Sequence, residues 1–285
     1  MCFLLAVVKF SPPRLTHVIP YIGRVTAVTS LGDEVFIARS RSQRVEVYDA
    51  NTCSFQRCIT IPGPRDSWQL YGLAACAHYQ CLYASDWTKD RIYRVELIDG
   101  NAVKKWSVAP YGGPIGLSVN KAHNVVVACT GANKVLEYTT HGTLVREISL
   151  HDAVTKPWHA VQLSTGDYVV SQHIMSPGAV SIVGAYGQLV RHYRPSDLSG
   201  LRQMKCPTSL AVTKNDDILV AYAYNNRILS LNSSLGSAHE LVLPVDGGNG
   251  IERPRGLCLD ESRGRLYIGE GWGQCRVLVF DDVLL

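Results

Sequence analysis

The stretch Arg253-Pro-Arg-Gly-Leu-Cys-Leu259 is followed by two short β-rich runs, Leu266-Tyr-Ile-Gly269 and Arg276-Val-Leu-Val-Phe280. Each run has the length of one strand and is rich in the β-branched, aliphatic and aromatic residues that favour strands. Glycine and charged residues separate the runs, as is typical of turns. The stretch therefore predicts three consecutive strands.

The same unit recurs along the whole chain. Its opening segments are residues 25–28, 71–74, 115–118, 158–161, 208–211 and 255–258, and the second residues of successive segments are 43 to 50 positions apart. A second strand is predicted at 35–38, 82–85, 125–128, 168–171, 218–221 and 266–269, and a third at 44–48, 91–95, 134–138, 179–183, 227–231 and 276–280. A fourth is predicted at 55–61, 102–108, 144–150, 189–193 and 240–243. Four strands in a repeat of this length indicate a β-propeller.

The sixth unit ends after three strands, whereas the unassigned segment 15–19 has the character of a fourth strand. Closing a ring with strands from both chain ends would remove an open sheet edge, which otherwise invites aggregation. We therefore predict one all-β domain over residues 1–285, a six-bladed β-propeller with four-stranded antiparallel blades. An N-terminal strand at about 14–20 is predicted to complete the blade at 254–285.

Composition excludes several classes of protein. Charged residues make up 18% of the chain and apolar residues 46%, which argues against disorder, and the net charge of +4 excludes a globally basic binder. The longest apolar run, residues 2–8, is too short to cross a membrane. Nine scattered cysteines without a C-x-x-C motif argue against a disulfide framework, and Cys76 and Cys81 are expected to be buried beside a tight hairpin. We expect a cytoplasmic monomer with reduced thiols that binds no membrane, metal or cofactor.

The units resemble those of NHL-repeat propellers. The matching segments are Gly113-Pro-Ile-Gly-Leu-Ser-Val119, Ser85-Asp-Trp-Thr-Lys-Asp-Arg-Ile92 and Cys206-Pro-Thr-Ser-Leu-Ala-Val212 with Asn225-Asn-Arg-Ile228. The resemblance extends over all six units and implies a six-bladed propeller. It also implies a binding function, because the family includes RNA-binding and protein-binding propellers of tripartite-motif proteins. The RING and B-box patterns of those proteins are missing here, so ubiquitin-ligase chemistry is not expected.

In a propeller, the loops that lead into the innermost strands and those that join the second and third strands emerge on one face, where a site is expected. Ten basic or aromatic residues of these loops are predicted to bind a partner: Arg24, Arg39, Arg41, Tyr71, Trp87, Lys89, Trp158, Tyr224, Arg255 and Trp272. Arg253 lies close to them in the sequence. Cations beside aromatic faces suit single-stranded RNA, and the same residue types dominate protein interfaces. We expect a non-catalytic binding or scaffold propeller whose partner is a protein or single-stranded RNA.

A structural role for the basic residues is the simpler alternative. A basic residue begins the third strand in five of the six units, and in one of them Arg91 could pair with Asp86. Recurrent positions of this kind often serve the fold rather than a partner.

The alternative function is a small-molecule hydrolase or lyase that uses the channel mouth, since more distant six-bladed relatives include lactonases, an amidating lyase and strictosidine-synthase-like enzymes. The same loops hold His159, His173, Asp86 and Glu270. The two histidines could act as an acid and base near neutral pH. Two carboxylates and two histidines make a poor metal cage, because catalytic zinc needs about three protein ligands and calcium needs more oxygen donors.

Overall fold

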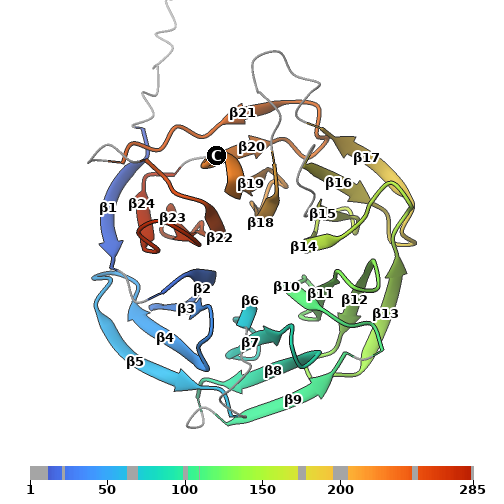
Figure 1. The fold of residues 1–285 in the computed structure, drawn as a ribbon, viewed down its shortest axis with the longest axis horizontal. Helices are drawn as coiled ribbons and strands as arrows, with labels where there is room; N and C mark the ends of the chain where they lie inside the picture. The colour runs from blue at the N-terminus through green and yellow to red at the C-terminus, as the bar shows by residue number, and fades with distance from the viewer. Residues whose placement is uncertain are drawn as a thin grey trace, which may run out of the picture.

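The computed structural model describes residues 12–20, 23–62, 70–98, 102–108, 110–172, 178–194, 205–245 and 250–283. Six four-stranded antiparallel sheets form the blades of a ring, confirming the predicted six-bladed β-propeller (Figure 1). In each blade the first strand lies nearest the centre and the fourth lies at the rim (Figure 1). Among the described residues, no helix is long and apolar enough to span a membrane.

The strands follow the predicted order closely. Blade 1 contains β2 (Val25–Leu31), β3 (Glu34–Arg39), β4 (Arg44–Asp49) and β5 (Phe55–Thr60). Blade 2 contains β6 (Leu70–Cys76), β7 (Cys81–Asp86), β8 (Arg91–Glu96) and β9 (Val103–Ser107). Blade 3 contains β10 (Pro114–Val119), β11 (Val125–Cys129), β12 (Lys134–Tyr138) and β13 (Leu144–Ser149). Blade 4 contains β14 (Pro157–Gln162), β15 (Tyr168–Gln172), β16 (Ala179–Val183) and β17 (Leu189–Tyr193). Blade 5 contains β18 (Pro207–Val212), β19 (Ile218–Tyr222), a 3-10 turn η3 (Ala223–Asn225), β20 (Arg227–Leu231) and β21 (Ala238–Glu240).

Blade 6 is built from both ends of the chain. It contains β22 (Pro254–Asp260), β23 (Arg265–Glu270), β24 (Val277–Asp281) and β1 (Arg14–Ile19). Strand β1 pairs antiparallel with β24, and Ile19 lies opposite Val277 with only 1% of its surface exposed. The predicted closure of the ring by an N-terminal strand is therefore confirmed.

One predicted strand has the wrong bounds. The fourth strand of blade 5 was expected at 240–243, but β21 ends at Glu240. Leu241 and Leu243 instead pack against the cluster of buried side chains between blades 5 and 6. These two leucines are apolar because they pack between blades. The alternation of apolar and polar residues along one strand does not reveal such contacts.

The hydrophobic core is divided among the blade interfaces. Each cluster of buried side chains draws on two neighbouring blades; one between blades 1 and 2, for example, includes Phe36, Val47, Leu82 and Tyr93. The second strands are buried along most of their length. Each blade is thus stabilised mainly by packing on its neighbours, as expected of a repeat architecture.

Two glycines of the opening segments allow the innermost strands to approach one another. A Cβ atom at Gly72 would lie 2.3 Å from the carbonyl oxygen of Ile115, and one at Gly116 would lie 2.4 Å from that of Trp158. No side chain fits at such distances, so glycine is required for close packing around the centre. The channel is narrow as a result.

None of the eight described cysteines forms a disulfide. Cys76 and Cys81 lie opposite each other across the β6–β7 hairpin and are buried, as predicted. Burial raises the pKa of several thiols, including that of Cys129 to about 12.

Candidate functional site

Strand register places the predicted binding loops at one end of the blades. The first residues of the innermost strands pair with the last residues of the second strands, as Val25 does with Arg39 and Pro254 with Glu270. The loop that leads into each blade therefore lies beside the loop between its second and third strands. We call this end of the ring the channel-mouth face.

Arginine and aromatic side chains alternate where blades 5, 6 and 1 meet on this face. The Arg24 guanidinium carbon lies 3.6 Å from the ring centroid of Trp272. The guanidinium carbon of Arg253 lies 4.9 Å from the centroids of both Trp272 and Tyr224. Cation–π contacts of this kind contribute about 0.5 to 2 kcal/mol each. Tyr224 and Trp272 remain 45% and 46% exposed, so they can still meet a partner.

These residues line a pocket of about 200 Å³, which we call the basic pocket. Its lining consists of Arg24, Thr208, Ala223, Tyr224, Arg253, Arg255, Gly271 and Trp272. Gly271 makes room for the stem of Arg255, because a Cβ atom there would lie 2.3 Å from its Cδ. Three arginines from blades 1 and 6 thus line one pocket.

An aromatic arc continues from the basic pocket across the face. The guanidinium carbon of Arg255 lies 5.7 Å from the ring centroid of Trp158. The ring of Tyr71 then makes edge contacts with Trp158 at 5.9 Å and with Trp87 at 6.1 Å. Trp87 is 45% exposed and lies over Gly113, where a Cβ atom would come within 2.8 Å of its Nε1. We call Tyr71, Trp87 and Trp158 the aromatic arc.

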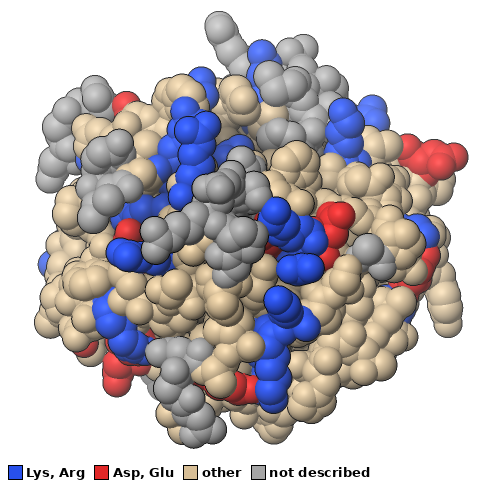
Figure 2. Space-filling model, turned by 60° about the horizontal axis from the view of Figure 1, so that its bottom comes forward, with Lys and Arg blue, Asp and Glu red and all other residues tan. Residues whose placement is uncertain are grey.

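The guanidinium groups of Arg24, Arg253 and Arg255 form no ion pair with any carboxylate of the described residues. Other arginines near this end are neutralised; Arg276, for example, lies 3.0 Å from Glu270. Figure 2 shows Lys and Arg side chains spread over the middle of the visible face, with Asp and Glu sparser there. The basic pocket therefore carries an excess of positive charge among the residues that the structure describes.

Arg39 differs from the other predicted binding residues because it is only 3% exposed. Its Nε bonds to the carboxylate of Glu46 at 2.9 and 3.0 Å, and its Nη1 donates to the carbonyls of Gly23 and Cys275. The side chain joins blade 1 to blade 6, so its position does not support the predicted contact with a partner.

Arg41 and Lys89 lie away from the basic pocket. Arg41 is exposed after β3 and lines a separate hollow on blade 1 together with Arg44 and Phe55. Lys89 is half-buried in the β7–β8 loop, close in sequence to Trp87. Seven of the ten predicted residues therefore form the basic pocket and the aromatic arc.

The two carboxylates of the alternative enzyme site are buried parts of the fold. One oxygen of Asp86 accepts hydrogen bonds from the backbone and hydroxyl of Thr88 and from the backbone of Lys89. The predicted ion pair of Asp86 with Arg91 is wrong: the residues lie opposite each other, but the other carboxylate oxygen of Asp86 is buried without a hydrogen-bond partner among the described residues. Through its Oδ1, Asp86 therefore stabilises the β7–β8 loop that follows it.

Glu270 is held in the same way at the end of β23. One oxygen accepts a hydrogen bond from the backbone of Glu252 at 2.9 Å, and the other lies 3.0 Å from Nε of Arg276. Burial raises its pKa. Asp86 and Glu270 stand in different blades and do not converge on the channel.

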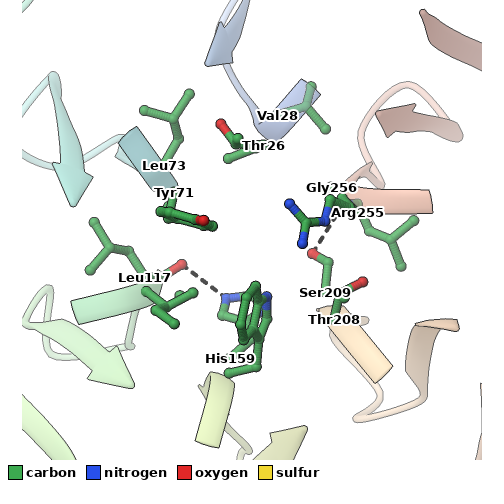
Figure 3. Close-up of a pocket in the computed structure, with 16 residues that line it drawn as sticks. Thr26, Val28, Tyr71, Leu73, Leu117, His159, Thr208, Ser209, Arg255 and Gly256 are labelled. Carbon is green, nitrogen blue, oxygen red and sulfur yellow. Dashed lines mark hydrogen bonds between the residues drawn. The ribbon is translucent and has the colours of Figure 1, made fainter. Parts of the chain in front are cut away.

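His159 links three blades around the channel. Figure 3 shows its hydrogen bond to Leu117. Its Nε2 lies 3.0 Å from the carbonyl of Leu117 and its Nδ1 lies 3.0 Å from the backbone nitrogen of Leu210. The backbone N–H donates to Nδ1, so Nε2 carries the proton and donates to the carbonyl. Burial lowers the pKa of the imidazole to about 4. Both ring nitrogens are occupied, and the predicted partner His173 lies outside the described residues.

The channel below the face is small. In Figure 3, Tyr71 and Arg255 extend into it from different blades, with His159 beside them. Its volume is about 40 Å³, whereas small-molecule sites usually measure about 300 to 1,000 Å³. Among the described side chains, no group of three or more His, Cys, Asp or Glu could hold a metal ion.

No family model and no curated protein matches the chain. Solved structures share its fold. A virginiamycin B lyase from Staphylococcus aureus is 12% identical with a TM-score of 0.68, and the match covers 96% of this chain and 100% of that one. A hydrazine synthase from Kuenenia stuttgartiensis is 19% identical with a TM-score of 0.66, over 93% and 79% of the two chains. A chain of a nidogen–laminin complex is 14% identical with a TM-score of 0.63, over 82% and 84%.

At such identities these likenesses show the propeller fold alone. They include lyases as well as a protein that forms a complex, so they favour no single activity. The NHL-repeat resemblance is not confirmed by them.

The sequence patterns missed two features of the site. Glu46 was not recognised as the partner that buries Arg39, although its acidic side chain within β4 was a signal. The contribution of Gly271 to the pose of Arg255 had no signal in the sequence, because the two residues are brought together only in space.

Proposed function

We propose that the protein is a non-catalytic, cytoplasmic binding module whose channel-mouth face binds single-stranded RNA. One observation carries the proposal: Arg24, Arg253 and Arg255 lack carboxylate partners among the described residues and are interleaved with half-exposed aromatic rings. Phosphates need cations, and unpaired bases need aromatic faces on which to stack. The resemblance to NHL-repeat propellers supports the same function.

The geometry suits an extended strand. The aromatic arc and the basic pocket together run across blades 2, 4, 5, 6 and 1 on one face. Stacking of a base on an aromatic side chain contributes about 1 to 3 kcal/mol. Guanidinium groups also form short, charge-assisted hydrogen bonds to phosphate.

A protein partner is the competing occupant, because aromatic residues and arginine also dominate protein interfaces. We favour RNA because of the charge: three cations of one pocket have no carboxylate partner among the described residues, and they call for a partner with regularly spaced negative charge. Of the catalytic residues weighed for a hydrolase or lyase, His159 and Glu270 are engaged within the fold, and Asp86 is engaged through one oxygen while its Oδ2 is buried without a hydrogen-bond partner in the described part of the chain. These residues do not converge on one site, so the structure offers less support for that reaction.

Binding to a mixed-sequence pool of single-stranded RNA, measured by filter retention at low and near-physiological salt, tests the proposal. We expect Trp87→Ala to weaken binding roughly tenfold, since it removes one stacking surface. Arg255→Glu should weaken it further and reduce its salt dependence. Arg191→Gln, on the outer strand β17, is a matched control that should change little.

An RNA affinity no greater than that of an unrelated protein of equal charge would refute RNA binding. Capture of an acidic peptide that depends on Trp87 and Arg255, with no retention of RNA, would identify a protein partner instead.

A further inference from the structure

The basic pocket adjoins a central channel that is too narrow for a nucleic-acid strand. We propose that the basic pocket binds the terminal phosphate monoester of an RNA strand, so that the module recognises a phosphorylated RNA end. The inference rests on the proposed function and adds to it the part of the RNA that enters the pocket.

The first argument is charge. Arg24, Arg253 and Arg255 place three guanidinium groups on one pocket, and no Asp or Glu is among its described lining residues. Of the nearby carboxylates, Glu270 pairs with Arg276, and Glu252 accepts a hydrogen bond from the backbone of Gln274 at 3.0 Å and forms no ion pair with the three arginines.

The charge of the ligand follows from that of the pocket. A phosphate monoester carries about −1.5 to −2 at neutral pH, because its second pKa is near 6, and it offers three acceptor oxygens. A phosphodiester within a strand carries only one negative charge. Three converging guanidinium groups therefore favour a terminal monoester over an internal phosphate.

The second argument is shape. The basic pocket measures about 200 Å³, and Thr208 and Arg255 line both it and the central channel. The channel has a volume of only about 40 Å³, since its innermost strands are drawn together at Gly72 and Gly116. A strand therefore cannot continue from the basic pocket into the channel, which favours a terminal group in the pocket.

The aromatic arc gives the remainder of the strand a path. Arg255 touches both regions, because it lines the basic pocket and lies over the ring of Trp158. Tyr71 contacts Trp158, and Trp87 contacts Tyr71 in turn. With the terminal phosphate in the pocket, the next unpaired bases can stack along the arc.

The test compares one short single-stranded RNA in three forms: with a 5′-phosphate, with a 3′-phosphate, and with hydroxyl groups at both ends. Affinities are measured at near-physiological salt on the full chain. We expect one phosphorylated form to bind about tenfold more tightly than the hydroxyl form, since charge-assisted hydrogen bonds to arginine are among the strongest. The preferred end gives the direction of the strand on the face.

Arg24→Gln and Arg253→Gln should each weaken binding of all three RNAs, and should weaken that of the preferred phosphorylated form most, so that most of the preference is lost. Arg191→Gln, which removes an exposed arginine on β17, should leave the preference intact. Uridine 5′-monophosphate should compete for the pocket at concentrations at which uridine does not.

The outcomes separate the two proposals. Equal affinity for the three RNAs would overturn the inference and leave RNA binding intact, as would a preference that both arginine variants retain. If none of the three RNAs bound this protein more tightly than it bound an unrelated protein of equal charge, RNA binding would be refuted. The present inference would fall with it.

Discussion

His159 provides a quantitative test of the structure through the pH dependence of stability. In the folded protein its pKa is lowered from 6.5 to about 4, because burial disfavours the charged imidazole. The unfolded chain therefore binds a proton near pH 6.5 that the folded protein does not take up until about pH 4. Between these values, lowering the pH favours the unfolded state.

The magnitude follows from the size of the shift. One pKa unit corresponds to about 1.4 kcal/mol, so linkage predicts a loss of about 2 kcal/mol from this residue on going from neutral pH to about pH 5. The loss approaches about 3 kcal/mol below pH 4 and nearly vanishes above pH 7. His159→Gln should lack this component, since an amide can donate to Leu117 and accept from Leu210 without titrating.

Urea unfolding of the wild type and His159→Gln near pH 7.5 and pH 5 measures the effect. The free energy of unfolding of the wild type should fall by about 2 kcal/mol more than that of the variant. His141→Gln, at an exposed turn, is the control and should follow the wild type. If His159→Gln lost as much stability with acid as the wild type, the assignment of a neutral, doubly hydrogen-bonded imidazole would be wrong.

Three further predictions concern the fold. Arg39→Met should lower the free energy of unfolding by roughly 3 kcal/mol in urea titrations, because it leaves Glu46 without its charged partner. The RNA affinity of the folded protein should stay unchanged; a loss of affinity without a loss of stability would show that Arg39 contacts the partner. Gly116→Ala should lower the melting temperature clearly, since backbone atoms occupy the space of its Cβ. Gly236→Ala should have little effect, because only the exposed hydroxyl of Ser234, 3.2 Å from the Cβ position, has to move; equal effects would contradict the close packing. Removing the chain through residue 19 should expose the edge of β24 and cause aggregation visible by light scattering, and a stable soluble monomer would argue against ring closure by β1.

The fold was largely predictable because its information is local and repeated. Opening segments such as Tyr71-Gly-Leu-Ala74 recur at a nearly constant interval, and that interval sets the number of blades. The unassigned segment 15–19 and the missing fourth strand of the last unit together indicated how the ring closes. The prediction failed at 240–243, where apolar side chains serve a neighbouring blade.

The candidate site was predictable to the level of its face. Position within the repeat determines which end of a blade a residue occupies, so Trp87 and Trp272 were correctly assigned to the loops of one face. Position alone does not determine whether a side chain points outward. Arg39 occupies the same place in its repeat as Asp86, and both turned out to be buried.

By itself, the sequence determined the six blades, their strand order, the closure of the ring and the loops that share a face, because each depends on short-range periodicity. Only the tertiary structure decided which arginines lack a carboxylate partner among the described residues and which arginines join neighbouring blades. Arg24 and Trp272 are far apart in the sequence and touch because blades 1 and 6 become neighbours when the ring closes. Contacts between blades depend on the direction of each side chain across an interface, which no repeat within one blade encodes.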